Sequence, residues 1–263
     1  MARVDLLLGK PPREGTLPAA VAELLRGRGH QVRVHLPRQE PVGTGTLAGS
    51  DLVLHRGLSD VADDLLDALG AAGVPVCNPW PASRALRDRT RWAALLRAAG
   101  VPVPAQVVRT SWAEVLAGAG TEVVVKAAAG TGRGRGVLTG TRDTLPGEAP
   151  GPGPWVVEHR LPHDGTDRKL YVVGPAVRGL LKASTLTSGH TPGGVPFEPD
   201  AKLRQLARRA ARAVDGHLLG VDVVLGPDGP VVVDVNDVPG YRGVTDAATL
   251  VAAHLLSPHL AAR

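Results

Sequence analysis

Apolar residues in the first eighty positions alternate between short continuous runs and helical spacing. Runs at 4–8, 31–36, 51–56 and 74–78 predict strands. Leu17, Val21, Leu24 and Leu25 recur on one face and predict a helix over 16–28, and a second helix is expected over 59–72. Strands that alternate with helices imply a parallel sheet, so this part reads as an α/β unit.

After the Pro-rich segment 78–83, a helix is predicted over 83–99, and from residue 106 strands dominate. The strands are the segments QVVR, EVVVKA, GVLTG, WVVEHR, KLYVVG and AVRGLLKAS, with a Gly/Pro loop at 145–154. Two further helices are expected over 199–213 and 246–256. We therefore expect three lobes, at 1–80, 81–160 and 161–263.

The segment VDVVLGPDGPVVVDVNDVPGY, residues 221–241, predicts two apolar strands joined by a Gly-Pro-Asp-Gly turn. If the turn centres on Asp228, Asp222 and Asp234 face each other with Cβ atoms roughly 5 Å apart. Asn236 then points to the same face. Carboxylates this close repel unless a cation lies between them, and hard oxygen ligands suit Mg²⁺ together with nucleotide phosphates. A solvated hairpin with acidic turns is the alternative.

The segment EVVVKAAAGTGRGRGV, residues 122–137, places Lys126 at the end of a strand, before a loop rich in glycine. Backbone N–H groups of such a loop can close on phosphate oxygens, and a lysine adds a positive charge for them. The order of residues is not that of a P-loop. An ordinary hairpin is the alternative, because this chain has 33 glycines.

A third segment, residues 155–174, ends one strand at Glu158 and His159 and begins another near Lys169. Extended backbone at 158–161 could pair with the edge of an adenine, and Asp167 could hold a ribose hydroxyl. Alone, the segment also fits a plain polar hairpin.

Composition excludes several classes of function. The chain is 43% hydrophobic, and no apolar run reaches the roughly 18 residues of a membrane span. Cys77 is the only cysteine, which excludes an internal disulfide and fits a reducing cytoplasm. The net charge of +5 is spread along the chain, so we expect anionic small molecules and no nucleic acid as partners.

The order of these segments resembles the ATP-grasp superfamily over nearly the whole chain. The resemblance implies an ATP-grasp fold, in which an α/β N-terminal lobe precedes two β-rich lobes that clamp Mg-ATP. It implies that Arg89 and Lys126 grip the phosphates, as the catalytic residues, with Gly132, Gly134 and Gly136. By the same resemblance, Glu158 and His159 lie at adenine, Asp167 at the ribose, and Asp222, Asp234 and Asn236 bind Mg²⁺.

Some residues are more similar to the inositol polyphosphate kinase branch of the superfamily than to RimK-type ligases. Arg89, the D-x-N order at 234–236 and the PGY at 239–241 follow that branch. The segment LHRGLSD, residues 54–60, is similar to a further motif of the branch, and KAST implies nucleotide contacts by Lys182 and Ser184. The acceptor would then meet Lys10, His55, Arg56, Arg133, Arg135, Lys169 and Gly240.

Two enzyme functions and one binding function remain open. A kinase that transfers the γ-phosphate to a hydroxyl of a small anionic or polyol substrate is the first interpretation. The alternative is a RimK-like carboxylate–amine ligase that acts through an acylphosphate, and the third is a nucleotide-binding regulator without turnover. The oligomeric state does not follow from the sequence.

Overall fold

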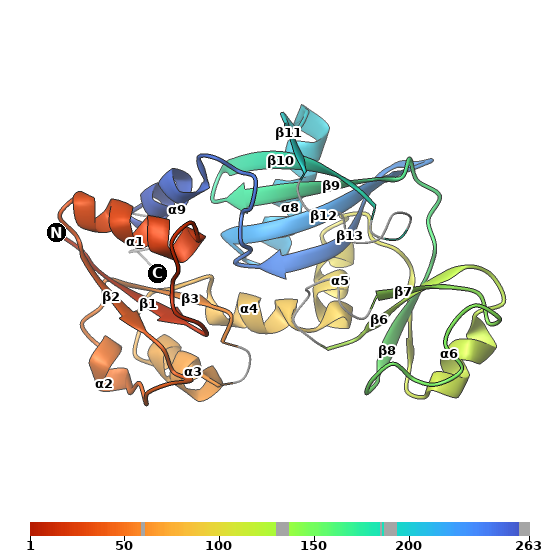
Figure 1. Ribbon diagram of the computed structural model, residues 1–263, viewed down its shortest axis with the longest axis horizontal. Helices are drawn as coiled ribbons and strands as arrows, with labels where there is room; N and C mark the ends of the chain where they lie inside the picture. The colour runs from red at the N-terminus through yellow and green to blue at the C-terminus, as the bar shows by residue number, and fades with distance from the viewer. Residues whose placement is uncertain (59–60, 130–136, 185, 187–193, 258–263) are drawn as a thin grey trace.

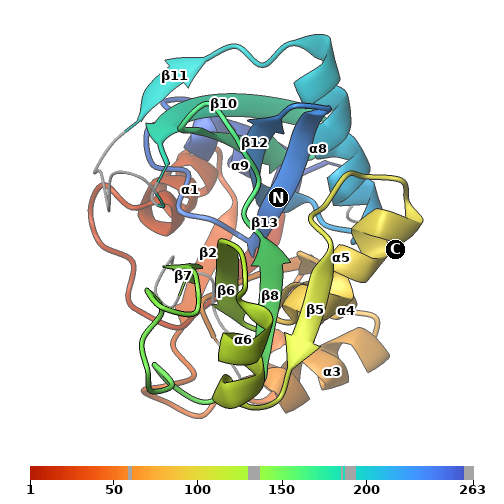
Figure 2. The same ribbon diagram turned by 90° about the vertical axis from the view of Figure 1, so that its right-hand side faces the viewer.

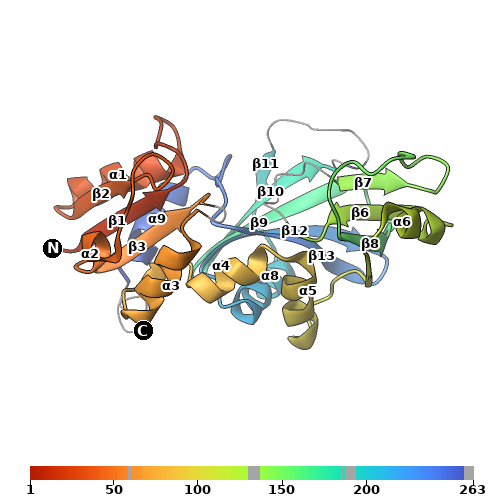
Figure 3. The ribbon, with the colours of Figure 1, turned by 90° about the horizontal axis from the view of Figure 1, so that it is seen from below.

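The computed structural model describes residues 1–58, 61–129, 137–184, 186 and 194–257. Its described strands form three sheets that lie in a row along the long axis of the molecule (Figures 1 and 3). The first sheet is parallel and the other two are antiparallel. None of the described helices is long and apolar enough to cross a membrane.

The N-terminal sheet has the strand order β2-β1-β3-β4, and all three of its pairings are parallel. The elements of this lobe follow the predicted alternation of strand and helix. They are β1 (Arg3–Leu8), α1 (Leu17–Gly27), β2 (Gln31–His35), α2 (Thr44–Leu47), β3 (Leu52–Arg56), α3 (Asp63–Ala71) and β4 (Val76–Cys77). The predicted α/β unit is therefore confirmed.

Two helices, α4 (Trp80–Leu86) and α5 (Arg89–Ala98), replace the single helix predicted over 83–99. The chain breaks at Asp88, whose side chain accepts hydrogen bonds from the backbone N–H groups of Thr90 and Arg91 and caps α5. Asp88 also forms an isolated bridge to Ala129. The prediction of one continuous helix is wrong because this cap and bridge start a new helix at Arg89.

The small sheet has the order β5-β8-β6-β7, with one helix beside it (Figure 2). Its elements are β5 (Gln106–Arg109), α6 (Trp112–Gly118), β6 (Val123–Ala127), β7 (Val137–Gly140) and β8 (Trp155–His159). A separate core of valine, leucine and two tryptophans, Trp112 and Trp155, holds α6 against the strands.

The central sheet has the order β11-β10-β9-β12-β13. Its elements are β9 (Thr166–Val173), β10 (Ala176–Ala183), β11 (Val195–Phe197), α8 (Ala201–Ala213), β12 (Leu218–Gly226) and β13 (Gly229–Asp237). Side chains alternate between its two faces. One face is apolar and packs against α5 and α8 through Leu170, Val172 and Val221. The other face carries the polar residues of the predicted site.

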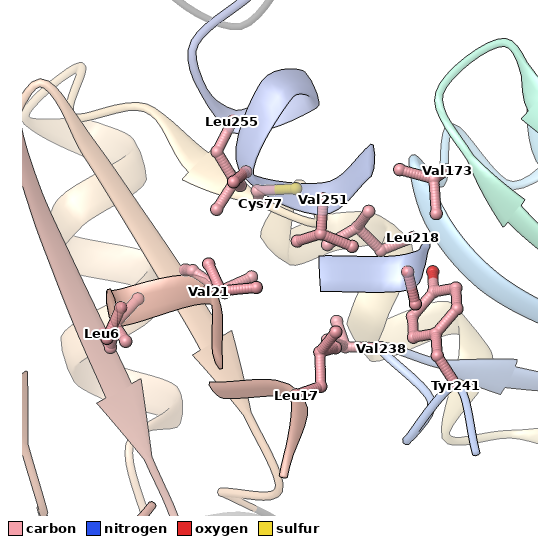
Figure 4. Packing of buried hydrophobic residues seen from close by; sticks show 14 of the residues in the cluster. Leu6, Leu17, Val21, Cys77, Val173, Leu218, Val238, Tyr241, Val251 and Leu255 are labelled. Carbon is pink, nitrogen blue, oxygen red and sulfur yellow. The ribbon is translucent and has the colours of Figure 1, made fainter. Parts of the chain in front are cut away.

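The final helix, α9 (Ala247–Leu255), returns to the N-terminal lobe and packs beside α1 (Figure 1). Leu17 and Val21 of α1 share one core with Val251 and Leu255 of α9. Figure 4 shows the same core reaching Val173 of the central sheet and Tyr241 of the loop that follows β13. The first and last described helices thus join two lobes through one apolar cluster.

Candidate functional site

The two carboxylates of the predicted hairpin face each other across β12 and β13. Asp222 pairs with Asp234, and Gly220 pairs with Asn236, so all three side chains lie on one face of the sheet. Asn236 Nδ2 donates to Asp222 Oδ2 at 3.2 Å and to Asp234 Oδ2 at 3.4 Å. The predicted convergence is confirmed, while metal binding stays a prediction.

A β-bulge beside Asp234 creates this arrangement. Val223 pairs with Val232, whereas Asp222 pairs with Asp234, so Val233 is an extra residue in β13. The carbonyl of Val233 accepts a hydrogen bond from Lys126 Nζ at 2.9 Å. The bulge therefore brings the two carboxylates opposite each other. It also supplies a backbone acceptor to a lysine of the neighbouring sheet.

Lys126 is held by a buried ion pair within the small sheet. Its Nζ donates to Glu158 Oε2 at 2.7 Å, and Gln106 Nε2 donates to Glu158 Oε1 at 2.8 Å. The side chains of Lys126 and Glu158 are 8% and 3% exposed. Such a pair fixes the ammonium next to β13, at the junction of the small and central sheets.

Arg89, the first residue of α5, approaches the same junction from the helix side. Its Nη1 donates to the carbonyl of Ala127 at 2.6 Å, and its backbone N–H donates to the carbonyl of Ala128 at 2.9 Å. Its Nε lies 3.9 Å from Asp234 Oδ1. The structure thus brings Arg89, Lys126 and the hairpin carboxylates together, as expected from the sequence.

Lys169 of β9 pairs with Asp222, its neighbour on β12. Its Nζ lies 2.7 Å from Asp222 Oδ1 and 2.9 Å from Oδ2. Burial lowers the pKa of Lys169, but the carboxylate of Asp222 outweighs it and the pKa is raised overall. This contact did not follow from the sequence, where Lys169 was expected to meet the acceptor.

Of the two carboxylates, Asp234 is the one whose charged form is disfavoured by its surroundings. Burial, and then the charge of Asp222, raise the pKa of Asp234, although Arg89, Lys126 and Lys169 oppose the shift. A carboxylate with a raised pKa is incompletely neutralised by its surroundings. This electrostatic imbalance favours a cation beside Asp234.

The donor set fits Mg²⁺ in its chemistry. Two carboxylates and one amide oxygen are hard ligands, and Mg²⁺ completes its coordination with water and phosphate oxygens. Asn236 would serve by turning its amide, so that Oδ1 replaces Nδ2 toward the carboxylates. In the part of the chain that the structure describes, no three His, Cys, Asp or Glu side chains group as metal ligands. Nucleotide oxygens would therefore have to supply the remaining ligands.

The other residues predicted to contact nucleotide lie around this cluster. Asp167 and Lys182 are paired across β9 and β10, on the face that carries Lys169. Ser184 follows β10, is buried, and donates its backbone N–H to the carbonyl of Gly165 at 2.9 Å. His159 is exposed at the end of β8. Five predicted loop residues lie outside the described residues: Gly132, Arg133, Gly134, Arg135 and Gly136.

The structure places some of the residues predicted to meet the acceptor near one another and buries His55 away from the site. Arg56 Nε donates to the carbonyl of Val238 at 2.9 Å, which places it against the loop that holds the exposed Gly240. Lys10 is exposed after β1. His55 is buried, with Nε2 3.0 Å from the carbonyl of Asn78, so the structure does not bring it to the carboxylate cluster.

Sequence reasoning missed two polar contacts that shape the site. It placed Glu158 at adenine and did not foresee the ion pair with Lys126; a glutamate within the apolar strand WVVEH, next to a strand that ends in lysine, was the available signal. It also passed over Asn78, which is fully buried and joins the lobes through its amide. The only signal there was an asparagine directly after an apolar run.

Solved structures show which fold this is. Over 97% of its length, the chain is similar to a RimK domain ATP-grasp protein from Sphaerobacter thermophilus, with a TM-score of 0.75, 24% identity and 100% of that chain covered. Over 95%, it is similar to the ATP-grasp ligase PsnB, solved with a minimal precursor, Mg and ADP, with a TM-score of 0.69, 20% identity and 96% of that chain covered. The protein has the ATP-grasp fold, and the predicted fold class is confirmed.

Curated proteins match a shorter part of the chain. A probable alpha-L-glutamate ligase from Trichodesmium erythraeum is 33% identical over 91 residues, which are 32% of this chain and 30% of that protein. The chain thus matches about a third of the length of such relatives. No model of a known protein family matches it. The similar proteins lend no support to the inositol polyphosphate kinase branch.

Proposed function

We propose that the protein is an ATP-dependent carboxylate–amine ligase that uses Mg-ATP. The observation that carries the proposal is the meeting of Asp222, Asp234 and Asn236 with Lys126 and Arg89 where the small and central sheets join. Opposed carboxylates beside two basic residues suit a divalent ion and a polyphosphate together. The ATP-grasp fold and the ligase names of similar proteins favour a ligase over the kinase that the sequence placed first.

In this function, a carboxylate oxygen of the acceptor attacks the γ-phosphorus of ATP. The bond from that phosphorus to the bridging oxygen breaks, and ADP leaves. An amine nitrogen then attacks the acyl carbon, the bond from carbon to the phosphate oxygen breaks, and the nitrogen loses a proton as phosphate departs. Mg²⁺ would supply charge neutralisation between phosphate oxygens. The residues of the chain bind and orient the reactants, so no covalent enzyme intermediate is needed.

Each group has a role that its position supports. Lys126 and Arg89 would neutralise phosphate oxygens, and the buried contact of Lys126 with Glu158 keeps its ammonium in place. Asp222, Asp234 and Asn236 would hold Mg²⁺. Asp167, Lys182, Ser184 and His159 would border the nucleotide. Lys10, Arg56 and Gly240 would border the acceptor.

The test follows ADP and free phosphate separately while Mg-ATP is incubated with two pools of compounds. One pool holds amino acids and short peptides, and the other holds inositol phosphates and polyols. A ligase releases ADP and phosphate in equal amounts with the first pool, and hydroxylamine in place of the amine traps a hydroxamate. ADP without free phosphate, seen with the second pool alone, would show a kinase and overturn the proposal.

A further inference from the structure

We propose that Lys169 occupies the place of the metal ion on Asp222, and that its ammonium moves from Asp222 to the acceptor when Mg²⁺ binds. The inference rests on the proposed function, because it takes Asp222 as a Mg²⁺ ligand. It adds an ordered relationship between metal, lysine and acceptor.

The contact between Lys169 and Asp222 resembles that of a bound cation. The ammonium approaches both carboxylate oxygens at once, at 2.7 and 2.9 Å. The two side chains are 20% and 24% exposed, so water screens the contact only in part. Lys169 and Asp222 are direct neighbours on β9 and β12, which fixes the ammonium above the carboxylate.

Mg²⁺ and this ammonium compete for the same oxygens. A divalent ion held between Asp222 and Asp234 would stand beside the Lys169 ammonium, and like charges at such a distance repel. The facing carboxylates also repel when no cation lies between them. Lys169 relieves that repulsion at Asp222, while Arg89 Nε lies 3.9 Å from Asp234 Oδ1, too far for a hydrogen bond.

Tyr171 and Tyr241 connect Lys169 to the loop that holds Gly240. Lys169 Nζ lies 6.0 Å from the ring centre of Tyr171, the next residue on the same face of β9. Tyr171 in turn stacks on Tyr241, with ring centres 5.1 Å apart, and Tyr241 follows Gly240. A lysine that leaves Asp222 along Tyr171 therefore approaches the proposed acceptor side. The acceptor carboxylate would gain its cation only after the metal is in place.

The experiment measures binding of Mn²⁺ to the protein without nucleotide or acceptor, from the EPR signal of the free ion. Mn²⁺ takes the same oxygen ligands as Mg²⁺. Lys169→Met removes the competing ammonium, so Mn²⁺ should bind about tenfold more tightly than to the wild type. Lys169→Arg keeps the charge and should stay near the wild-type affinity.

Arg178→Met is the matched control. Arg178 also forms an ion pair from the central sheet, with Asp246 at 2.7 Å, but neither residue belongs to the proposed metal site. Its loss should leave the affinity for Mn²⁺ unchanged. A tenfold gain in this variant would mean that any lost positive charge favours the metal, which would overturn the inference.

Thermal unfolding gives a second readout. In EDTA, Lys169→Met should unfold at a lower temperature than the wild type, and MgCl₂ should raise its Tm by more than it raises that of the wild type.

Equal or weaker Mn²⁺ binding by Lys169→Met would overturn the inference, as would no binding by either protein. Should that variant fail to fold, Lys169→Gln is titrated instead. Release of ADP and phosphate by the wild type tests the proposed function separately.

Discussion

Asn78 Nδ2 donates a hydrogen bond to Asp237 Oδ1 at 2.7 Å, across 159 residues of sequence. Asn78 directly follows β4 of the N-terminal lobe, and Asp237 directly follows the proposed metal ligand Asn236. The same side chain accepts from the backbone N–H groups of His217 and Leu218, each at 2.7 Å, and donates to the carbonyl of Leu218 at 3.0 Å. One fully buried amide therefore fixes the ends of β12 and β13 against the first lobe.

Asn78→Ala should lower the free energy of unfolding by about 2–4 kcal/mol, because several buried polar groups lose their partner. Denaturation in urea measures this change. Asn78→Asp keeps the acceptor oxygen but places a second carboxylate beside Asp237, so it should be destabilised as well. A change below about 0.5 kcal/mol in Asn78→Ala would show that water replaces the amide and that the link is weak.

Lys126→Met should lose turnover and also stability, because Glu158 stays buried without its ammonium. Breaking a buried ion pair from one side costs about 3–5 kcal/mol, whereas replacing both partners can be nearly neutral. The double variant Lys126→Met with Glu158→Gln should therefore regain most of the stability and none of the activity. Equal stability of the single and double variants in urea would contradict this account of the pair.

Substitution of the two facing carboxylates should have opposite effects on stability without metal. Asp234→Asn relieves repulsion from Asp222 and should raise the free energy of unfolding by roughly 1 kcal/mol. Asp222→Asn loses the contact with Lys169 and should lower it. Both variants should lose turnover with Mg-ATP. Thermal unfolding in EDTA compares them, and normal turnover by either variant would reject the metal assignment.

His55 should make stability depend on pH. Burial lowers the pKa of His55, and the charge of Asp237 opposes that shift only in part. The unfolded chain therefore binds the proton more readily than the folded protein, so stability falls as the pH drops below the usual histidine value of about 6.5. His55→Gln should flatten this fall in denaturation curves between pH 7.5 and 5.5. His159→Gln, which changes an exposed histidine, should retain it.

The hairpin shows how far the sequence leads and where it stops. The period of two along a strand correctly placed Asp222, Asp234 and Asn236 on one face. The assumed turn centre at Asp228 was wrong, since Gly226 pairs with Gly229 and the centre lies between Pro227 and Asp228. The bulge at Val233 restores the predicted opposition. Nothing in a run of valines marks which residue will bulge.

One remaining difference in the fold has a local signal, and the others depend on contacts between distant segments. Helix α6 was not predicted, although Ser111 and Glu114 form a complete capping box at its start. The break between α4 and α5 depends partly on the bridge from Asp88 to Ala129, a contact between distant segments that no local pattern reports. Pairings such as Lys169 with Asp222 likewise arise from sheet order, which the sequence leaves open.

The packing of α9 on α1 has a consequence for how the chain folds. Residues 1–80 leave the ribosome before residues 247–255, and the core that Leu17 and Val21 of α1 enter is completed when Val251 and Leu255 have been made. The N-terminal lobe therefore cannot complete its core during early synthesis and depends on a late segment for it. We therefore expect few stable folding intermediates that contain the N-terminal lobe alone, before α9 has been made.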